Sequence, residues 1–117
     1  MENPNAVKPI IIKDPDHGQT YTLEFSRDTV RFAEGRGFDI SDVAKFPMSK
    51  IPELFYYAFR MHHKNLSRSQ TDAILFDGLG GVPEGLMERL GQLYAAPFDT
   101  LMLDEGEAKN GTMTVEL

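Results

Sequence analysis

The chain has no cysteine and no tryptophan, and few basic residues for its 117 positions. Without cysteine there can be no disulfides, no thiolate catalysis and no cysteine-ligated zinc sites. The 12 Lys and Arg are outnumbered by 18 Asp and Glu, which gives a net charge of −6. Because nucleic-acid affinity comes largely from Lys and Arg at the phosphates, this balance argues against a nucleic-acid partner.

Long apolar runs are also missing. No run approaches the roughly 20 apolar residues that cross a bilayer. Residues 1–5 are too polar to begin a secretory leader. We therefore expect no membrane association and a cytoplasmic location, with which the absence of cysteine agrees.

What remains is the composition of one folded domain. Hydrophobic residues make up 41% and charged residues 26% of the chain, and its length suits a single domain. We expect a flexible lead over residues 1–9, a domain over residues 10–103 and an acidic, flexible tail over residues 104–117. The tail carries half of the net charge. It suits either a frayed terminus or an electrostatic guide for a basic partner.

Two short segments near the start have strand patterns. Residues 10–12 are three isoleucines, and residues 21–25 alternate apolar with polar side chains. Between them, residues 14–18 (DPDHG) have the chemistry of a turn. The pattern predicts a β-hairpin with one buried face. Because an isolated hairpin is marginal in water, it must pack against the helices that follow.

Helix-start signals follow the hairpin. Ser26 is a suitable N-cap, so we expect a helix that begins at Arg27. Gly35 and Gly37 are expected to end it. Ser67 and Gln70 have the spacing of a capping box, which predicts a second helix that ends in the glycine-rich residues 78–81.

The most apolar helix is predicted after Pro47. We expect Ser49 to cap it, which places Pro52 in the first turn, where a missing N–H is tolerated. We expect Asn65 to end it. Its apolar stripe has helical spacing and consists of Ile51, Leu54, Phe55, Ala58, Phe59 and His62.

A short helical turn is predicted before that helix. We expect Asp39 to cap it, and Phe38 and Ile40 to pack into the core beside it. Val43 and Phe46 are expected on its apolar side.

The last long helix is predicted to have Pro83 in its first turn and to end near Ala96, because Pro97 follows. Its apolar stripe is Leu86, Leu90, Leu93 and Tyr94. A short terminal turn with Phe98, Leu101 and Met102 is expected next. The predicted fold class is α+β, mainly α, with an N-terminal β-hairpin followed by four or five short helices.

Motifs for catalysis or ligand binding are nearly absent. His62 and His63 are adjacent, so on a helix they point about 100° apart and do not form the two-ligand face of a zinc protease. Gly78, Gly80 and Gly81 lack the lysine and hydroxyl residue of a phosphate-binding loop. We expect no enzyme activity, no cofactor and no metal.

Aromatic and methionine side chains are concentrated in residues 55–61. Such groups either fill a core or form an adaptable protein-binding surface. Tyr56, Tyr57 and Met61 lie off the main stripe and are candidates either for the core or for contact with a partner protein. From the patterning of the last helix we add Met87 and Tyr94 as candidates for partner contact.

Five segments, taken in order, resemble a known family. They are residues 21–30 (YTLEFSRDTV), 34–40 (EGRGFDI), 47–63 (PMSKIPELFYYAFRMHH), 71–75 (TDAIL) and 90–94 (LGQLY). They resemble the small tail assembly chaperones of long-tailed, siphovirus-type phages and prophages of Gram-positive bacteria. The resemblance covers residues 18–103 and rests on apolar and turn patterns.

The resemblance implies a function and partners. Such chaperones bind the apolar helical stretches of the tape-measure protein in the host cytoplasm, keep it soluble and help to recruit tail-tube protein. They also self-associate, so a homo-oligomer is implied. In many relatives a translational frameshift adds a C-terminal extension. An ending at Leu117 suits either the short form or a phage that does not use the extension.

Two other functions stay open at this point. One is a small protein-binding regulator encoded by a phage or another mobile element. The other is a structural tail subunit that is retained in the finished particle.

Overall fold

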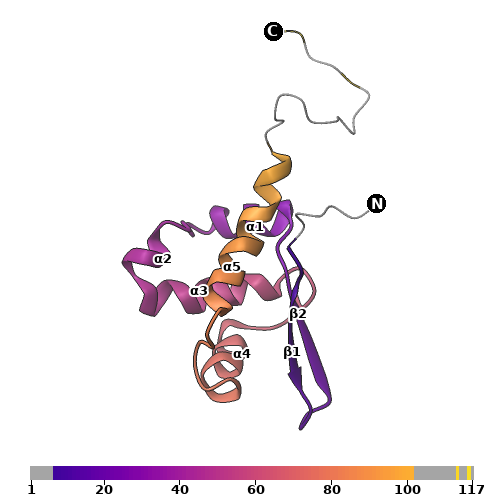
Figure 1. Ribbon diagram of the computed structural model, residues 1–117, viewed down its shortest axis with the longest axis vertical. Helices are drawn as coiled ribbons and strands as arrows, with labels where there is room; N and C mark the ends of the chain where they lie inside the picture. Colours follow the sequence, from indigo (N-terminus) through magenta and orange to yellow (C-terminus); the bar gives the residue numbers. More distant parts are fainter. Residues whose placement is uncertain (1–6, 102–112, 114–115, 117) are drawn as a thin grey trace.

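The computed structural model describes residues 7–101, 113 and 116. A two-stranded antiparallel sheet opens the fold, and helices follow it, which confirms the predicted α+β, mainly α class (Figure 1). Most of the predicted tail over residues 104–117, and residues 1–6 of the predicted lead, lie outside the described residues. The elements are β1 (Ile10–Asp14), β2 (Gln19–Leu23), α1 (Arg27–Gly35), α2 (Asp42–Lys45), α3 (Pro47–Phe59), α4 (Arg68–Ala73), the π-helical turn η1 (Ile74–Gly78), α5 (Leu86–Ala95) and the 3-10 turn η2 (Ala96–Thr100).

The hairpin pairs β1 with β2 so that Ile12 lies opposite Tyr21 and Ile10 opposite Leu23. These four side chains share one face, since alternate residues of a strand point the same way. Ile12 and Leu23 on that face are buried. The opposite face carries Ile11, which is exposed, so the hairpin buries one face as predicted.

The outer edge of β2 is bonded to the C-terminal end of α3. The Thr22 amide donates to Nε2 of His63 at 2.9 Å, and the Glu24 amide donates to the Ala58 carbonyl at 3.0 Å. The Thr22 amide thus points away from β1. Since Ile11 is its partner in the register, the Ile11 amide and carbonyl point away from β2 as well.

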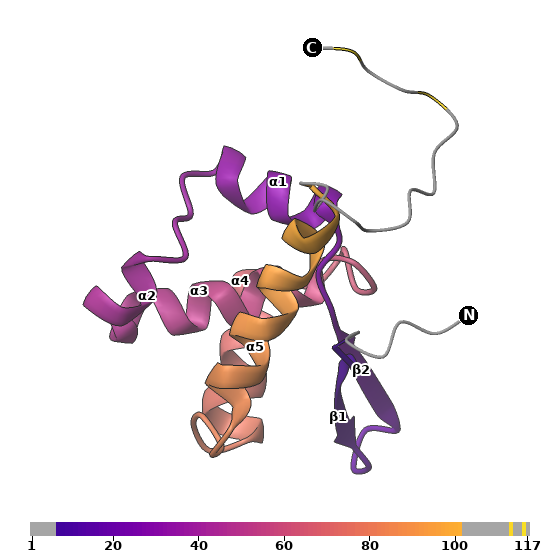
Figure 2. The same ribbon diagram turned by 45° about the horizontal axis from the view of Figure 1, so that its top comes forward.

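Among the described residues, the outer edge of β1 is held just before its start. Arg89 on α5 donates from its guanidinium to the carbonyls of Lys8 and Pro9. Pro9 and Pro15 flank the strand and carry no N–H. Figure 2 shows the hairpin standing beside α3 and α5, with its turn extending past them.

Two of the four predicted helix caps, Ser26 and Ser67, are confirmed. At α1 the Ser26 side chain accepts from the Thr29 amide, and the Thr29 hydroxyl in turn accepts from the Ser26 amide. At α4 the Ser67 and Gln70 side chains form the same reciprocal pair. Asp39 does not cap α2 as predicted, because the N-cap position is Ser41. The Asp39 carboxylate instead accepts from the amide and hydroxyl of Ser41 in the turn before the helix. These hydrogen bonds lower the pKa of Asp39.

The start of α3 differs from the prediction. The helix begins at Pro47, two residues before Ser49, because proline is well suited to a first helical position. Ser49 makes no cap, and its hydroxyl bonds back to the Phe46 carbonyl. Pro52 is therefore inside the helix rather than in its first turn. Its missing N–H leaves the Met48 carbonyl without a helical donor, at a turn where Met48 is 92% exposed.

Three other boundaries or placements also need correction. α3 ends at Phe59, earlier than the predicted stop at Asn65. α5 begins at Leu86 after Gly85, whose φ of 85° is left-handed, so Pro83 lies before the helix.

Ile40 and Phe46 are exposed rather than packed in the core, because no neighbouring element of the described chain closes over them. α5 ends at Ala95, close to the predicted stop.

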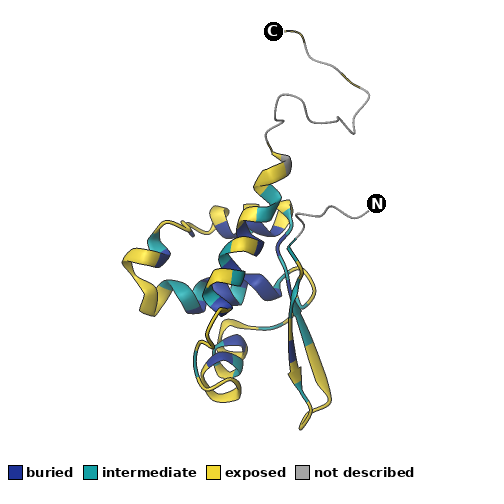
Figure 3. Cartoon of the chain, viewed as in Figure 1, coloured by how far each residue is buried: buried dark blue, intermediate teal, exposed yellow. Residues whose placement is uncertain are grey.

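The core lies where α3 meets α5, α1 and the hairpin. Figure 3 shows the buried residues concentrated there and the exposed ones at the hairpin turn and around α2. Aromatic rings make many of the contacts edge-to-face: Phe59 packs against Phe55 and Tyr21, at centroid distances of 5.0 and 5.7 Å. The buried aliphatic side chains include Leu23, Val30, Leu54, Leu75, Leu86, Leu90 and Leu93.

Candidate functional site

Two of the five residues proposed for partner contact lie in the core. Tyr57 is 4% and Tyr94 3% exposed, and both rings pack against Phe38, at centroid distances of 5.5 and 5.7 Å. Burial raises the pKa of both phenols, that of Tyr94 to about 12 with help from nearby carboxylates. Contrary to the sequence-based hypothesis, neither ring is available to another chain in the folded domain.

The other three proposed residues have different surroundings. Tyr56 and Met87 are half-buried and pack against the core. Met61, just beyond the end of α3, is exposed. Met61 therefore has the largest exposed fraction of the five, with Tyr56 and Met87 less exposed.

Larger exposed apolar groups lie at the junctions between elements. One group lies just before α2 and at the α2–α3 junction, a second lies in η1 and the segment after it, and a third lies at η2. The first is Ile40, Phe46 and Met48, the second Phe76, Leu79 and Val82, and the third Phe98 and Leu101.

The α2–α3 junction presents the most exposed of these groups. Phe46 occupies the N-cap position of α3. Its φ of −132° is not helical, so the backbone changes direction between α2 and α3. Its amide bonds to the Asp42 carbonyl and its own carbonyl accepts from the Lys50 amide. The backbone is thus fixed while the Phe46 ring, with the residue 57% exposed, points into solvent. We name Phe46 and Met48 the corner pair.

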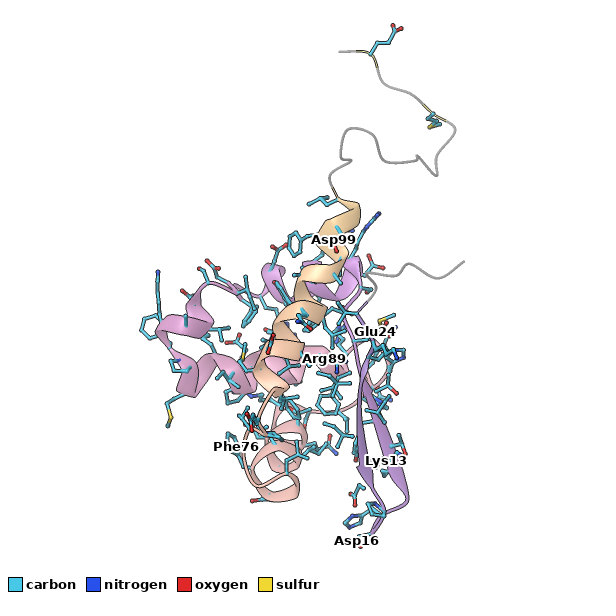
Figure 4. The ribbon with its side chains drawn as sticks, in the orientation of Figure 1. Lys13, Asp16, Glu24, Phe76, Arg89 and Asp99 are labelled. Atoms are coloured by element: carbon cyan, nitrogen blue, oxygen red, sulfur yellow. The ribbon has the colours of Figure 1, made fainter. Side chains whose placement is uncertain are left out.

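A cleft of about 550 Å³ separates the turn end of the hairpin from η1. On the hairpin side it is lined by Ile12, Tyr21 and the turn residues. On the helical side it is lined by Ala73, Ile74 and the residues that end η1. Figure 4 shows Lys13 and Asp16 near the hairpin turn and Phe76 on the helical side. The two walls come from segments about 60 residues apart in sequence.

The wide backbone turn of η1 shapes the helical wall of the cleft. The Leu79 amide donates to the Ile74 carbonyl at 2.8 Å, five residues back, and the Gly81 amide to the Leu75 carbonyl at 2.9 Å. Leu75 is fully buried and anchors the turn to the core. Short π-helical segments are rare and often lie at functional sites.

The hairpin is attached to α3 through a neutral histidine. His63 accepts the Thr22 amide at Nε2, which requires that this nitrogen carries no proton. Desolvation, and then the neighbouring His62, lower the pKa of His63. His62 itself lies 2.8 Å from a carboxylate oxygen of Glu24.

The described residues show neither a metal centre nor a membrane segment. No group of three or more His, Asp or Glu side chains among them is placed to hold a metal ion. No helix of the described chain has both the length and the apolar character needed to cross a bilayer.

A family model matches residues 6–117, which is nearly the whole chain. Its description is a domain of unknown function, DUF5055. The chain belongs to the DUF5055 family. No curated protein and no solved structure matches it.

In this DUF5055 domain, the cleft and the corner pair were missed by sequence reasoning. Residues 14–18 were recognised as a turn and residues 78–81 as a helix stop, but nothing in either segment indicates that the two face each other. For the corner pair a signal existed, because a proline directly after Phe46 favours a helix start there. Phe46 then lies at the end of an element, where fewer neighbours can cover it.

Proposed function

We propose that this protein is a tail assembly chaperone of a long-tailed phage or prophage. In this proposal it binds the apolar helical stretches of the tape-measure protein in the host cytoplasm, keeps that protein soluble and helps to recruit tail-tube protein. The observation that carries the proposal is the set of large apolar side chains exposed at the junctions between elements. The sequence resemblance to tail assembly chaperones supports it.

The exposed side chains suit a helical client. Apolar helices are recognised when their apolar face lies against side chains such as Phe, Leu and Met. Phe46 and Phe76 supply rigid aromatic area, and Met48 and Met61 supply flexible thioethers that adapt to different sequences. Exposed apolar groups of this kind commonly mark sites of protein interaction.

The charge of the chain suits a carrier of apolar surface. At a net charge of −6, copies of the protein repel one another. This repulsion opposes aggregation through the same side chains that would bind the client.

Co-expression with a tape-measure fragment tests the proposal. The fragment should be a predicted apolar helical stretch of a phage tape-measure protein. We expect the soluble fraction of the fragment to rise when the wild-type protein is present. A variant with Phe46→Ser, Met48→Ser and Phe76→Ser should lose most of that effect.

The matched control changes exposed polar residues instead. Ser69→Ala with Gln92→Ala removes no apolar surface and should keep the fragment soluble. Urea unfolding of each variant must show that the domain remains folded. If the fragment is equally soluble with and without the wild-type protein, the chaperone proposal is wrong. Recovery of this protein from purified virions would instead indicate a structural tail subunit.

A further inference from the structure

The cleft between the hairpin turn and η1 has an apolar interior that this chain leaves uncovered. Ile12 and Tyr21 form its hairpin wall, and Ile74 and Leu79 form its helical wall. Leu79 is exposed and Tyr21 is only half-buried. Its volume of about 550 Å³ lies in the range of sites that hold small ligands or a few side chains.

The rim of the same cleft is acidic. Asp14, Asp16 and Asp77 line it, against the single lysine Lys13. Asp14 is paired with His17, whose Nδ1 lies 2.9 Å from its carboxylate. Asp16 and Asp77 are exposed and take part in no ion pair within the described residues. The rim therefore presents unneutralised negative charge directly beside apolar surface.

We propose that this cleft binds a basic amphipathic helical segment of a partner protein. One or two apolar side chains of the segment enter between Tyr21 and Leu79. A neighbouring Lys or Arg of the segment lies against Asp16 and Asp77. Opposite charges at a rim select the partner and speed its association. The inference deepens the proposed function, on which it rests, by giving the client a chemical character: apolar helices flanked by basic residues.

A pair of designed peptides tests the cleft. One is a helical peptide with a leucine stripe flanked by lysines, and the other has glutamate at every lysine position. Fluorescence anisotropy should show binding of the lysine peptide and weak or no binding of the glutamate peptide. If the two peptides bind equally, or neither binds, the inference is overturned.

A matched pair of tryptophan variants locates the binding site. Ala73 is exposed and lines the cleft, so Ala73→Trp should obstruct it without disturbing the core. Ser69 is exposed on the same helix but does not line the cleft, so Ser69→Trp is the control. We expect Ala73→Trp to weaken lysine-peptide binding at least about tenfold, which is 1.4 kcal/mol. Ser69→Trp should leave it unchanged, and an unchanged affinity in Ala73→Trp would refute the site.

A charge variant tests the rim separately. Asp16→Asn with Asp77→Asn keeps the shape of both walls but removes two charges. We expect it to reduce lysine-peptide affinity several-fold at low salt and to make binding less sensitive to salt. If Ala73→Trp instead converts a dimer to a monomer in light scattering and leaves peptide affinity unchanged, a second copy fills the cleft and the inference is wrong.

Failure of this inference can be told from failure of the proposed function. If Ala73→Trp still keeps the tape-measure fragment soluble while the triple serine variant does not, the chaperone proposal stands and only the cleft assignment fails. If neither the wild-type protein nor any variant changes the solubility of the tape-measure fragment, the proposed function fails, whatever the peptide-binding results are.

Discussion

The phenylalanines on the buried side of α3 and those at the α2–α3 junction and in η1 have opposite surroundings. Phe55 and Phe59 are fully buried, whereas Phe46 and Phe76 are more than half exposed. The residue type is the same, so position decides. The side of α3 that carries Phe55 and Phe59 is covered by β2, α1 and α5. Phe46 lies between two helices and Phe76 in the short turn η1, where few neighbours cover them. The aromatic side chains of residues 55–61 thus mainly build the core, and most of the large exposed apolar side chains lie at the junctions.

The largest effect should come from truncating an aromatic residue on the buried side of α3. Phe59 contacts Phe55, Tyr21 and His63, so Phe59→Ala leaves a cavity and should destabilise the domain by about 3–5 kcal/mol. Phe76→Ala is the matched change at a junction and should cost less than about 1 kcal/mol. Urea unfolding measures both. Equal losses of unfolding free energy in Phe59→Ala and Phe76→Ala would show that the surroundings of these two residues do not differ as described.

A smaller loss should follow removal of the cap that orients α4. Ser67 satisfies the Gln70 amide at the start of the short helix that leads to Phe76 and to the cleft wall. Ser67→Ala should therefore cost about 1 kcal/mol, also measured by urea unfolding. Ser69→Ala on the same helix makes no cap and should change stability by less than about 0.5 kcal/mol. If Ser67→Ala lowered the free energy of unfolding as little as Ser69→Ala does, the packing of Leu75 alone, without the cap, would fix α4.

The smallest effect should be a dependence of stability on pH through the contact between hairpin and α3. The pKa of His63 lies below its ordinary value of 6.5 in the folded chain, because burial and His62 disfavour its charged form. The unfolded chain therefore takes up the proton first as the pH falls. The contribution of His63 to the free energy of unfolding is therefore fully present above pH 6.5 and is lost progressively below it.

Urea unfolding between neutral and mildly acidic pH measures this contribution. His63→Gln offers the Thr22 amide a side-chain oxygen that does not titrate, so this variant should lose less stability on acidification than the wild type. His17→Gln is the control, because His17 lies at the exposed hairpin turn, away from α3. If His17→Gln removes the pH dependence and His63→Gln does not, the histidine at the α3 end is not its source.

Local signals in the sequence were enough to predict much of the fold. Both serine caps act within four residues, and the hairpin needs only a turn between two strand patterns, so neither depends on distant contacts. The start of α3 was mispredicted because two local signals compete there: Ser49 can cap a helix, and Pro47 can begin one. The proline prevails, and Pro52 then lies inside a helix that the core holds in place.

The candidate site could be predicted much less well. An apolar stripe shows that a helix has a buried side, but it does not show which residues at its ends will lack a neighbour, so Ile40 and Phe46 were placed in the core. Tyr57 and Tyr94 were proposed as partner contacts, although both pack on Phe38. The cleft joins the hairpin turn to η1, and no local pattern records a contact between segments so far apart.

The two edges of the hairpin limit how copies of this chain can assemble. A fibril that grows by strand addition needs two open edges on each molecule, one to receive a copy and one to offer the next. Here the β2 edge is already bonded to α3, and β1 offers only the short stretch around Ile11 and Lys13 between two prolines. Strand addition at the β2 edge would have to displace these bonds, so we expect a second copy to pair through β1 rather than to extend an endless ladder.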